Sequence, residues 1–313
     1  MERSVLTGPS APVPTMTTRL SRVFFGGCAF VPYLLAGKLA GCPGTSFRQD
    51  CWGIAARGLV SGSRLSLRQA FSLVVGPMDS VRYFEFDFAQ RSIGDAHINH
   101  YLDVSSPRLF PLIFMRHNPN LTATLLNPDS TDLDETRHMI RALGLSERCM
   151  ADPRLIGACD FADCFDLITS ISVIEHIPND TDALAVMWRA LRPGGKLVVT
   201  VPCSSTPYEE FADSNQYGLL SPDDDGLIFW ERFYSQDCLE QRIFSITGAP
   251  SSMEIFGEAE RGTYDKNVQE KRRDPSYPIW REPWFVAQKW RFFPNLRALP
   301  GMGVVGMSFT KGI

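Results

Sequence analysis

The clearest change between hydrophobic and polar segments lies between residues 165 and 202. It begins with FDLITSI, a short apolar run of the kind found in a parallel strand that is buried on both faces. After a polar turn over 172–178, residues 179–191 place an apolar residue every three to four positions, which predicts an amphipathic helix. Residues 196–202 are rich in β-branched side chains and predict a second strand. The order strand, helix, strand predicts part of an α/β sheet.

The ends of these elements carry signals of their own. Asn179 to Asp182 supplies cap and first-turn acceptors for the helix, and Pro193, Gly194 and Gly195 stop it. In open α/β sheets, ligands bind in the crevice outside the carboxyl ends of the strands. We therefore expect a functional edge after the first strand, where the sequence places Ser170, Ser172, Glu175 and His176.

The segments FDLITSISVIEHIP and LRPGGKLVVTVP together resemble the region around strands four and five of class I S-adenosylmethionine-dependent methyltransferases, of the type 11-like kind. The resemblance implies an α/β fold, a doubly wound, Rossmann-like sheet of seven strands with an antiparallel last strand. It also implies S-adenosylmethionine as the cofactor. Residues 100–104, 121–127 and 148–152 correspond to the first three strands, and residues 301–311 to the last.

The resemblance assigns roles to residues after each strand. In this family the loop after strand one contacts the methionine part of the cofactor, an acid ending strand two binds the ribose, and an aspartate after strand three faces the adenine. The corresponding residues are Asp103, Ser105, Ser106, Asn127, Asp129 as a substitute for the missing acid, and Asp152, with Ser170 and Ser172 expected beside them.

Two of these positions depart from the family pattern. The loop after strand one, VSSPRLFP, has no glycine, the residue that takes positive φ and lets the backbone approach a ligand closely. Asn127 stands where the ribose acid is usual, and its amide lacks the charge of a carboxylate. A bacterial subgroup of these enzymes carries a similar serine-proline loop behind an Arg-Tyr-x-Glu-Phe segment, like Arg82 to Phe86 here.

The chemistry expected from this resemblance is methyl transfer, which mainly requires alignment of donor and acceptor. A general base is needed only where the acceptor must lose a proton, and His176 is the candidate because its ordinary pKa is near neutrality. Glu175 either orients His176 or holds the amine of the cofactor. Alternatively, His176 caps the turn or hydrogen-bonds the adjoining loop. The predicted acceptor is an oxygen or nitrogen of a small molecule or glycan, held against an insertion over Ser204 to Trp230.

Length and composition agree with a soluble enzyme. The chain has 313 residues, 21% of them charged, and its formal net charge of -4 gives no reason to expect a nucleic-acid partner. The eight cysteines are scattered, so we predict reduced thiols and no metal ligands. Asp223 to Asp225 is interpreted as a solvated turn. These features favour a cytoplasmic protein, and the sequence leaves its oligomeric state open.

We divide the chain into an N-terminal helical extension over 1–75 and a methyltransferase domain over 76–313, with an acceptor-specificity insertion at about 203–232. The apolar run within residues 19–41 has three interpretations: an accessory packed helix, a helix in weak contact with a membrane surface, and an export signal ending at Cys42. We expect the segment to be retained in the mature protein. Tyr83, Glu85 and Phe86 belong either to the core or to a lid.

Other classes fit the chain less well. A non-catalytic binding or scaffold protein of the methyltransferase type is the main alternative, because the glycine-rich loop is missing. A nicotinamide-dependent oxidoreductase is disfavoured by the absence of a GxGxxG motif after the first strand, and a serine hydrolase by the absence of a GxSxG motif. The sequence thus favours an S-adenosylmethionine-dependent methyltransferase.

Overall fold

The computed structural model describes the chain except residues 7–14, 61–64, 214, 216–217, 274–276 and 313. Parts of the predicted extension and insertion fall outside the described residues for this reason. Eight strands form the main sheet in the order β10-β9-β11-β6-β5-β2-β3-β4. They are β2 (His100–Val104), β3 (Thr122–Leu126), β4 (Cys149–Asp152), β5 (Phe165–Ile171), β6 (Leu191–Cys203), β9 (Ser252–Glu258), β10 (Trp290–Phe293) and β11 (Gly303–Thr310).

The connectivity confirms the predicted doubly wound sheet with an antiparallel last strand. Strands β4, β3, β2, β5 and β6 pair in parallel, whereas β11 pairs antiparallel with both β6 and β9. The number of strands differs from the prediction, because β10 adds an eighth strand antiparallel to β9. Its aromatic residues explain the addition: Trp290 and Phe292 lie 5.8 and 5.0 Å from the ring of Phe256 in β9.

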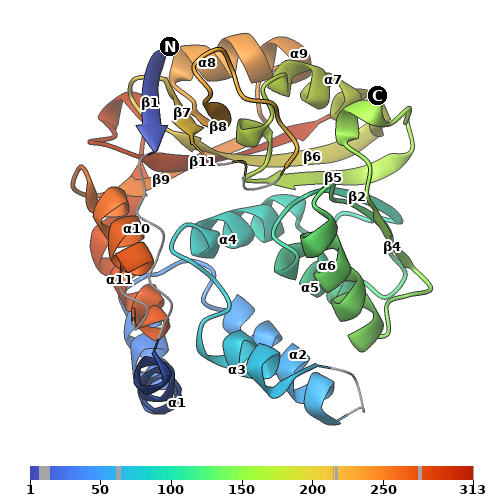
Figure 1. Cartoon of the computed structure of the whole chain (residues 1–313). Helices are drawn as coiled ribbons and strands as arrows, with labels where there is room; N and C mark the ends of the chain where they lie inside the picture. Colours follow the sequence, from blue (N-terminus) through green and yellow to red (C-terminus); the bar gives the residue numbers. More distant parts are fainter. Residues whose placement is uncertain (7–14, 61–64, 214, 216–217, 274–276, 313) are drawn as a thin grey trace.

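Helices cover both faces of this sheet (Figure 1). On one face lie α4 (Arg82–Ile93), α5 (Leu109–His117) and α6 (Ser130–Ala142), and on the other α7 (Asp180–Ala190), α8 (Gln236–Leu239) and α9 (Ser245–Thr247), joined by a π-helical turn over Glu240–Phe244. Because apolar side chains project from both faces of the central strands, the sheet separates two cores. Leu167 and Ile171 belong to the first, Ile168 and Val199 to the second.

The N-terminal part forms α1 (Met16–Leu39), α2 (Phe47–Val60) and α3 (Leu67–Val75). Helix α1 packs on α11 (Glu282–Lys289) so tightly that a Cβ on Gly37 would lie 2.5 Å from the backbone of Pro283. Its outer side leaves Leu20, Phe24 and Leu35 exposed. Of the helices in the described residues, α1 alone is long and apolar enough to cross a membrane, by length and composition only.

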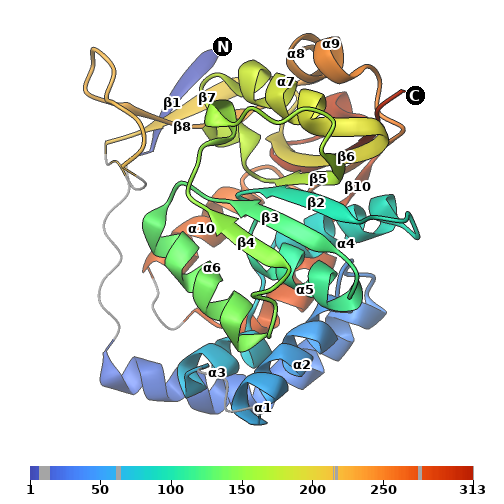
Figure 2. The ribbon, with the colours of Figure 1, turned by 90° about the vertical axis from the view of Figure 1, so that its right-hand side faces the viewer.

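The insertion after β6 is not a set of loops but a hairpin. It contains β7 (Tyr208–Ala212) and β8 (Ile228–Phe233), which pair antiparallel, and β1 (Glu2–Leu6) adds to β7 in parallel. Figure 2 shows this small sheet beside α7, far from α1. In the turn before β8, Asp223 accepts the backbone N–H groups of Asp225 and Leu227 and forms an ion pair with Arg3. Helix α10 (Thr263–Arg273) follows β9.

Candidate functional site

The loops after β2, β3, β4 and β5 are joined at one edge of the sheet. The backbone N–H of Ser105 donates to Leu126 O at 2.8 Å, and that of Asn127 donates to Asp152 O at 2.9 Å. The Ser106 hydroxyl accepts the N–H of Ile171 at 2.9 Å. Strand order reverses between β2 and β5, which is where doubly wound sheets bind ligands. The predicted cofactor residues therefore lie along one edge, at the topological switch point.

Asp103 is buried and braces the loop after β2. Its carboxylate accepts the hydroxyls of Thr169 at 2.6 Å and Tyr101 at 3.1 Å, and the N–H of Ser106 at 3.0 Å. Burial raises the pKa of Asp103 to about 6, although these donors oppose the shift. These contacts of Asp103 are all within the protein, and through them it fixes the position of Ser106 and of its neighbour Ser105.

Two serines at this edge adopt backbone conformations that usually require glycine. Ser105 has φ of 54° and Ser172 has φ of 49°, both in the left-handed region. The Ser105 hydroxyl donates to Leu126 O at 3.0 Å, and the Ser172 hydroxyl donates to Glu85 Oε1 at 2.5 Å. Ser105 thus makes the turn that glycine makes elsewhere in such loops. The buried hydroxyl of Ser170, in β5, has no hydrogen-bond partner.

The polar residues after β3 and β4 are held by their neighbours. The Asn127 amide donates to Asp132 at 2.7 Å and accepts the N–H of Asp129 at 3.0 Å. Asp129 in turn caps α6 by accepting the N–H of Thr131 at 2.9 Å. Asp152 forms an ion pair with Arg154 at 2.6 Å, and hydrogen bonding from that guanidinium lowers the pKa of Asp152.

A second group of polar side chains lies beyond the end of β5, in η2 (Ile174–His176) and in β8. Glu175 is buried, and His176 Nδ1 donates to the carbonyl oxygen of Trp230 at 2.6 Å. His176 Nε2 lies 3.9 Å from Glu175 Oε1, and one ligand atom each of Glu175, His176 and Glu231 fall within 4.8 Å of one another. We call these three residues the acidic cluster.

Burial controls the protonation of the acidic cluster. It raises the pKa of Glu175 well above the ordinary value, lowers that of His176, and raises that of Glu231 to about 8, with help from the neighbouring Glu210. The ring of His176 is therefore held neutral. Because Nδ1 donates to a carbonyl oxygen, Nε2 carries the lone pair.

Helix α4 supplies a charged pair, Arg82 and Glu85, near the acidic cluster. Glu85 is fully buried, accepts the hydroxyl of Thr200 at 2.8 Å and forms an ion pair with Arg82. Sequence reasoning assigned Glu85 to a core or a lid and missed that it holds Ser172. It missed Glu231 as well, since no strand was predicted within the insertion that contains β8. The Arg-Tyr-x-Glu-Phe segment was the available signal for Glu85.

Residues 114–199 match the family model Methyltransf_11, described as a methyltransferase domain. This range runs from α5 to β6 and includes the ends of β3, β4 and β5, but not Asp103, Ser105 and Ser106 at the end of β2. This segment of the chain is therefore similar to a methyltransferase domain. No curated protein matches the chain.

Solved structures similar to the chain are of low identity. The [4+2]-cyclase SpnF is 16% identical, with coverage of 97% of this chain and 100% of that chain and a TM-score of 0.46. The StiE O-MT domain is 12% identical, with coverage of 82% and 81% and a TM-score of 0.46. Geranyl diphosphate C-methyltransferase from Streptomyces coelicolor A3(2) is 11% identical, with coverage of 73% and 78% and a TM-score of 0.45.

S-adenosylmethionine is the cofactor of class I methyltransferase domains, and the edge of this domain fits it. Ser105 takes the left-handed conformation that the missing glycine would take, and Asp103 braces the loop from below. The unpartnered hydroxyl of Ser170 lies in the strand that ends at the same edge. The lack of glycine therefore does not prevent the loop after β2 from adopting a left-handed turn at Ser105.

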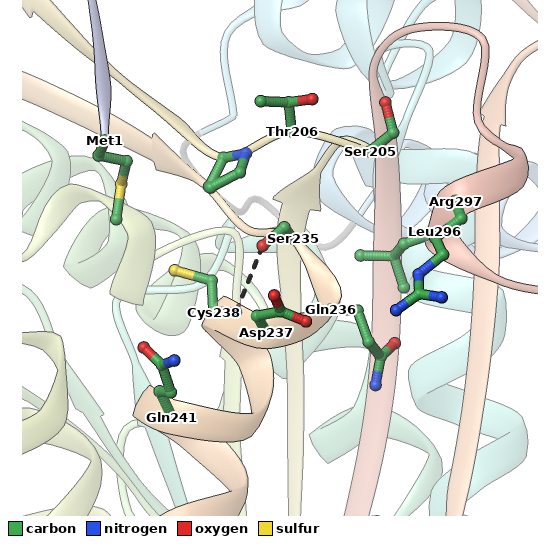
Figure 3. A pocket seen from close by; sticks show the side chains of 11 residues that line it. Met1, Ser205, Thr206, Ser235, Gln236, Asp237, Cys238, Gln241, Leu296 and Arg297 are labelled. Atoms are coloured by element: carbon green, nitrogen blue, oxygen red, sulfur yellow. Dashed lines mark hydrogen bonds between the residues drawn. The ribbon is translucent and has the colours of Figure 1, made fainter.

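A separate cavity of about 300 Å³ opens at the start of α8 (Figure 3). Figure 3 shows Ser205, Thr206, Gln236 and Arg297 around it, with Ser235 bonded to the backbone of Cys238. It contains none of the predicted cofactor residues and no member of the acidic cluster. The cavity thus differs from the site of the methyltransferase domain.

Proposed function

We propose that the protein transfers a methyl group from S-adenosylmethionine to an oxygen or nitrogen of a small-molecule or glycan-type acceptor. The observation that carries this proposal is the position of the acidic cluster, immediately after Ser172 at the switch point between β2 and β5. The basic nitrogen of His176 there can receive a proton from an acceptor.

The chain's residues divide the work by their position. Asp103 holds Ser105 and Ser106 for the methionine part of the cofactor, Asn127 and Asp129 stand at the ribose position, and Asp152 at the adenine position. When bound, S-adenosylmethionine would supply the sulfonium methyl group that is transferred to the acceptor. The proton of the acceptor passes to His176 Nε2, because Trp230 O holds the other nitrogen protonated.

The hairpin of β7 and β8 supports a small or glycan-type acceptor. Strand β8 packs against η2 and brings Trp230 beside His176, with ring centroids 5.5 Å apart. Aromatic rings next to carboxylates suit the apolar and hydroxyl faces of such molecules.

A non-catalytic methyltransferase-like protein remains the second candidate. It is favoured by the side chains of Asn127 and Asp152, which are paired with Asp132 and Arg154 at the places where the cofactor would bind. Such a protein would bind the cofactor weakly or not at all and would label no acceptor.

Calorimetric titration with S-adenosylhomocysteine separates these two candidates first. We expect micromolar affinity, on the order of -7 to -8 kcal/mol. Transfer from labelled S-adenosylmethionine is then measured in small-molecule, glycan, lipid and protein fractions of a lysate. Label in the small-molecule or glycan fraction supports the proposal. Weak or undetectable binding, or binding without label in any fraction, supports the non-catalytic protein.

We also propose that the protein acts in the cytoplasm with its N-terminal segment retained, and that α1 makes weak contact with a membrane surface. Retention is supported by the packing of α1 on α11 and by the buried position of Cys42. Mass spectrometry of the native protein tests it: a lipid-modified N-terminus at Cys42 would contradict the proposal.

A further inference from the structure

We propose that Glu175, His176 and Glu231 form a binding site for one divalent first-row transition-metal ion. The three side chains each direct one ligand atom into a space in which no two of these atoms are more than 4.8 Å apart. Two of them, His176 Nε2 and Glu175 Oε1, are 3.9 Å apart. We predicted no metal ligands from the sequence because the cysteines are scattered. No sequence pattern pointed to Glu231, which lies far along the chain from the Glu175-His176 pair.

The hydrogen bond of His176 prepares it as a ligand. Its Nδ1 donates to Trp230 O at 2.6 Å, so Nε2 carries a lone pair and faces a carboxylate. Metal-binding histidines commonly donate their second nitrogen to a carbonyl or carboxylate, which fixes the orientation of the ring. Here the carbonyl belongs to the residue before Glu231, so one segment of β8 both orients one ligand and supplies another.

A second observation points independently to a ligand. Glu175 is 1% exposed, and its Oε2 has no hydrogen-bond partner. A buried carboxylate oxygen without a partner is costly, and such groups are rare in native structures. A bound cation would supply the missing interaction.

The charges around this space leave room for a cation. Arg82 faces Glu175 and Glu231, but its guanidinium is ion-paired with Glu85. Glu210 lies beside Glu231 and adds a further acidic group. Arg82 is thus one positive charge among four carboxyl groups.

The donor set selects the class of ion. Imidazole nitrogen suits zinc, iron and copper, and carboxylate oxygen suits manganese and magnesium, so one nitrogen with two oxygens favours Zn²⁺ or Mn²⁺ over Mg²⁺. Zinc lies about 2.0 to 2.2 Å from such ligands, so its ligand atoms are about 3 to 4 Å apart, and the side chains need to close by roughly 1 Å. Three protein ligands leave a coordination position for water or an acceptor oxygen.

This inference deepens the proposed function at its own site without resting on it. An ion there would lower the pKa of a bound acceptor hydroxyl, so that its proton could pass to water, and His176 would then hold the ion instead of receiving the proton. Ion binding is measured with the protein alone, without cofactor or acceptor. If no ion binds, His176 remains the proposed proton acceptor. If no methyl transfer is found, the proposed metal site is unaffected.

The test is titration of the metal-free full-length protein with ZnCl₂ and, separately, with MnCl₂ followed by electron paramagnetic resonance. We expect one ion per chain, with micromolar or tighter affinity for Zn²⁺ and at least tenfold weaker affinity for Mg²⁺. Glu175→Gln and Glu231→Gln should each weaken binding at least tenfold. Glu240→Gln, the same change on an exposed helix residue, should leave the affinity unchanged.

Thermal unfolding guards against variants that fail to fold. Zn²⁺ should raise the melting temperature of the wild-type protein and of Glu240→Gln by several degrees, but not that of Glu175→Gln. No binding of either ion to the wild-type protein at millimolar concentration overturns the proposal and makes Arg82 the sole compensating charge. Binding that survives both cluster substitutions also overturns it, because the ion then lies elsewhere.

Discussion

The two ends of the functional edge differ in how their polar groups are paired. Near the predicted cofactor positions, Asp103 has three donors, Asn127 is bonded on both sides of its amide, and Asp152 is ion-paired. In the acidic cluster, by contrast, Glu175 has an oxygen with no donor and faces the lone pair of His176. These polar groups of the first region have their partners within the protein, whereas the Glu175 carboxyl group in the second region needs a proton or a ligand to gain its missing interaction.

The difference indicates what each region does. Polar groups that are fully paired stabilise the fold and position neighbouring backbone, and they lose little when no ligand is present. Unpaired buried groups cost stability and persist where function requires them. Substitutions at the cofactor positions should therefore change stability and cofactor affinity, whereas substitutions in the acidic cluster should change turnover.

The largest effect is expected for His176→Ala. Loss of the basic nitrogen should lower kcat by about 10² to 10⁴, whether His176 receives the proton or holds an ion, and should leave cofactor affinity nearly unchanged. The rate of methyl transfer is measured by single-turnover kinetics with the acceptor that the labelling experiment identifies. Cofactor affinity is measured by titration with S-adenosylhomocysteine. His97→Ala, at an exposed position, is the matched control. Unchanged turnover per folded molecule would assign His176 to a structural turn.

A smaller effect, on stability, is expected for Asp103→Ala. Removing the carboxylate leaves the N–H of Ser106 and two hydroxyls without their acceptor, which should lower the free energy of unfolding by about 2 to 4 kcal/mol. Urea unfolding of both proteins measures the change. Asp160→Ala, at an exposed carboxylate, should change it by less than about 0.5 kcal/mol.

The Asp103 carboxyl group should also make the free energy of unfolding depend on pH, and the direction of its pKa shift gives the sign. Its pKa is raised from 3.8 to about 6 in the folded protein, so folding favours the protonated form. The contribution of Asp103 to stability is therefore largest below pH 4 and is lost as the pH rises through 6, by up to about 3 kcal/mol. The difference in unfolding free energy between wild type and Asp103→Asn should shrink over that interval. A constant difference would show that Asp103 is ionised throughout.

The strands and helices around the edge could be predicted because their signals are local. Buried parallel strands such as β5 are continuous apolar runs, and α7 ends at Ala190, three residues before the Pro-Gly-Gly sequence that was expected to stop it. The division of the chain at residue 75 stays a prediction, and so do the roles assigned to the site residues.

The rest depends on contacts between distant segments. Glu231 reaches Glu175 and His176 only because the insertion forms a hairpin, and β1 pairs with β7 across some 200 residues of chain. Likewise, Glu85 holds Ser172 across 87 positions. No short-range pattern encodes such contacts, because they depend on tertiary packing.

At the cofactor positions, Asp152→Ala should weaken S-adenosylhomocysteine binding by about 1 to 3 kcal/mol, the usual cost of an unpaired polar partner. Arg154 sharpens the comparison, because it competes with the ligand for the same carboxylate. Arg154→Ala should leave the affinity unchanged or increase it. Titration calorimetry measures the affinity of the two variants for S-adenosylhomocysteine. An equal loss of affinity in both would mean that the ion pair between Asp152 and Arg154 has only a structural role.

The smallest effect concerns Ser105, whose left-handed backbone costs roughly 1 kcal/mol for a residue with a Cβ. Ser105→Gly relieves that cost but loses the hydroxyl bond to Leu126 O, so the free energy of unfolding should change by less than about 0.5 kcal/mol. Ser105→Ala loses the bond and keeps the strain, and should destabilise by about 1 kcal/mol. Urea unfolding of both variants measures the gap. If the two variants are equally stable, the loop does not need the glycine-like conformation at residue 105. That result would contradict the argument that Ser105 replaces the glycine of a cofactor-binding loop.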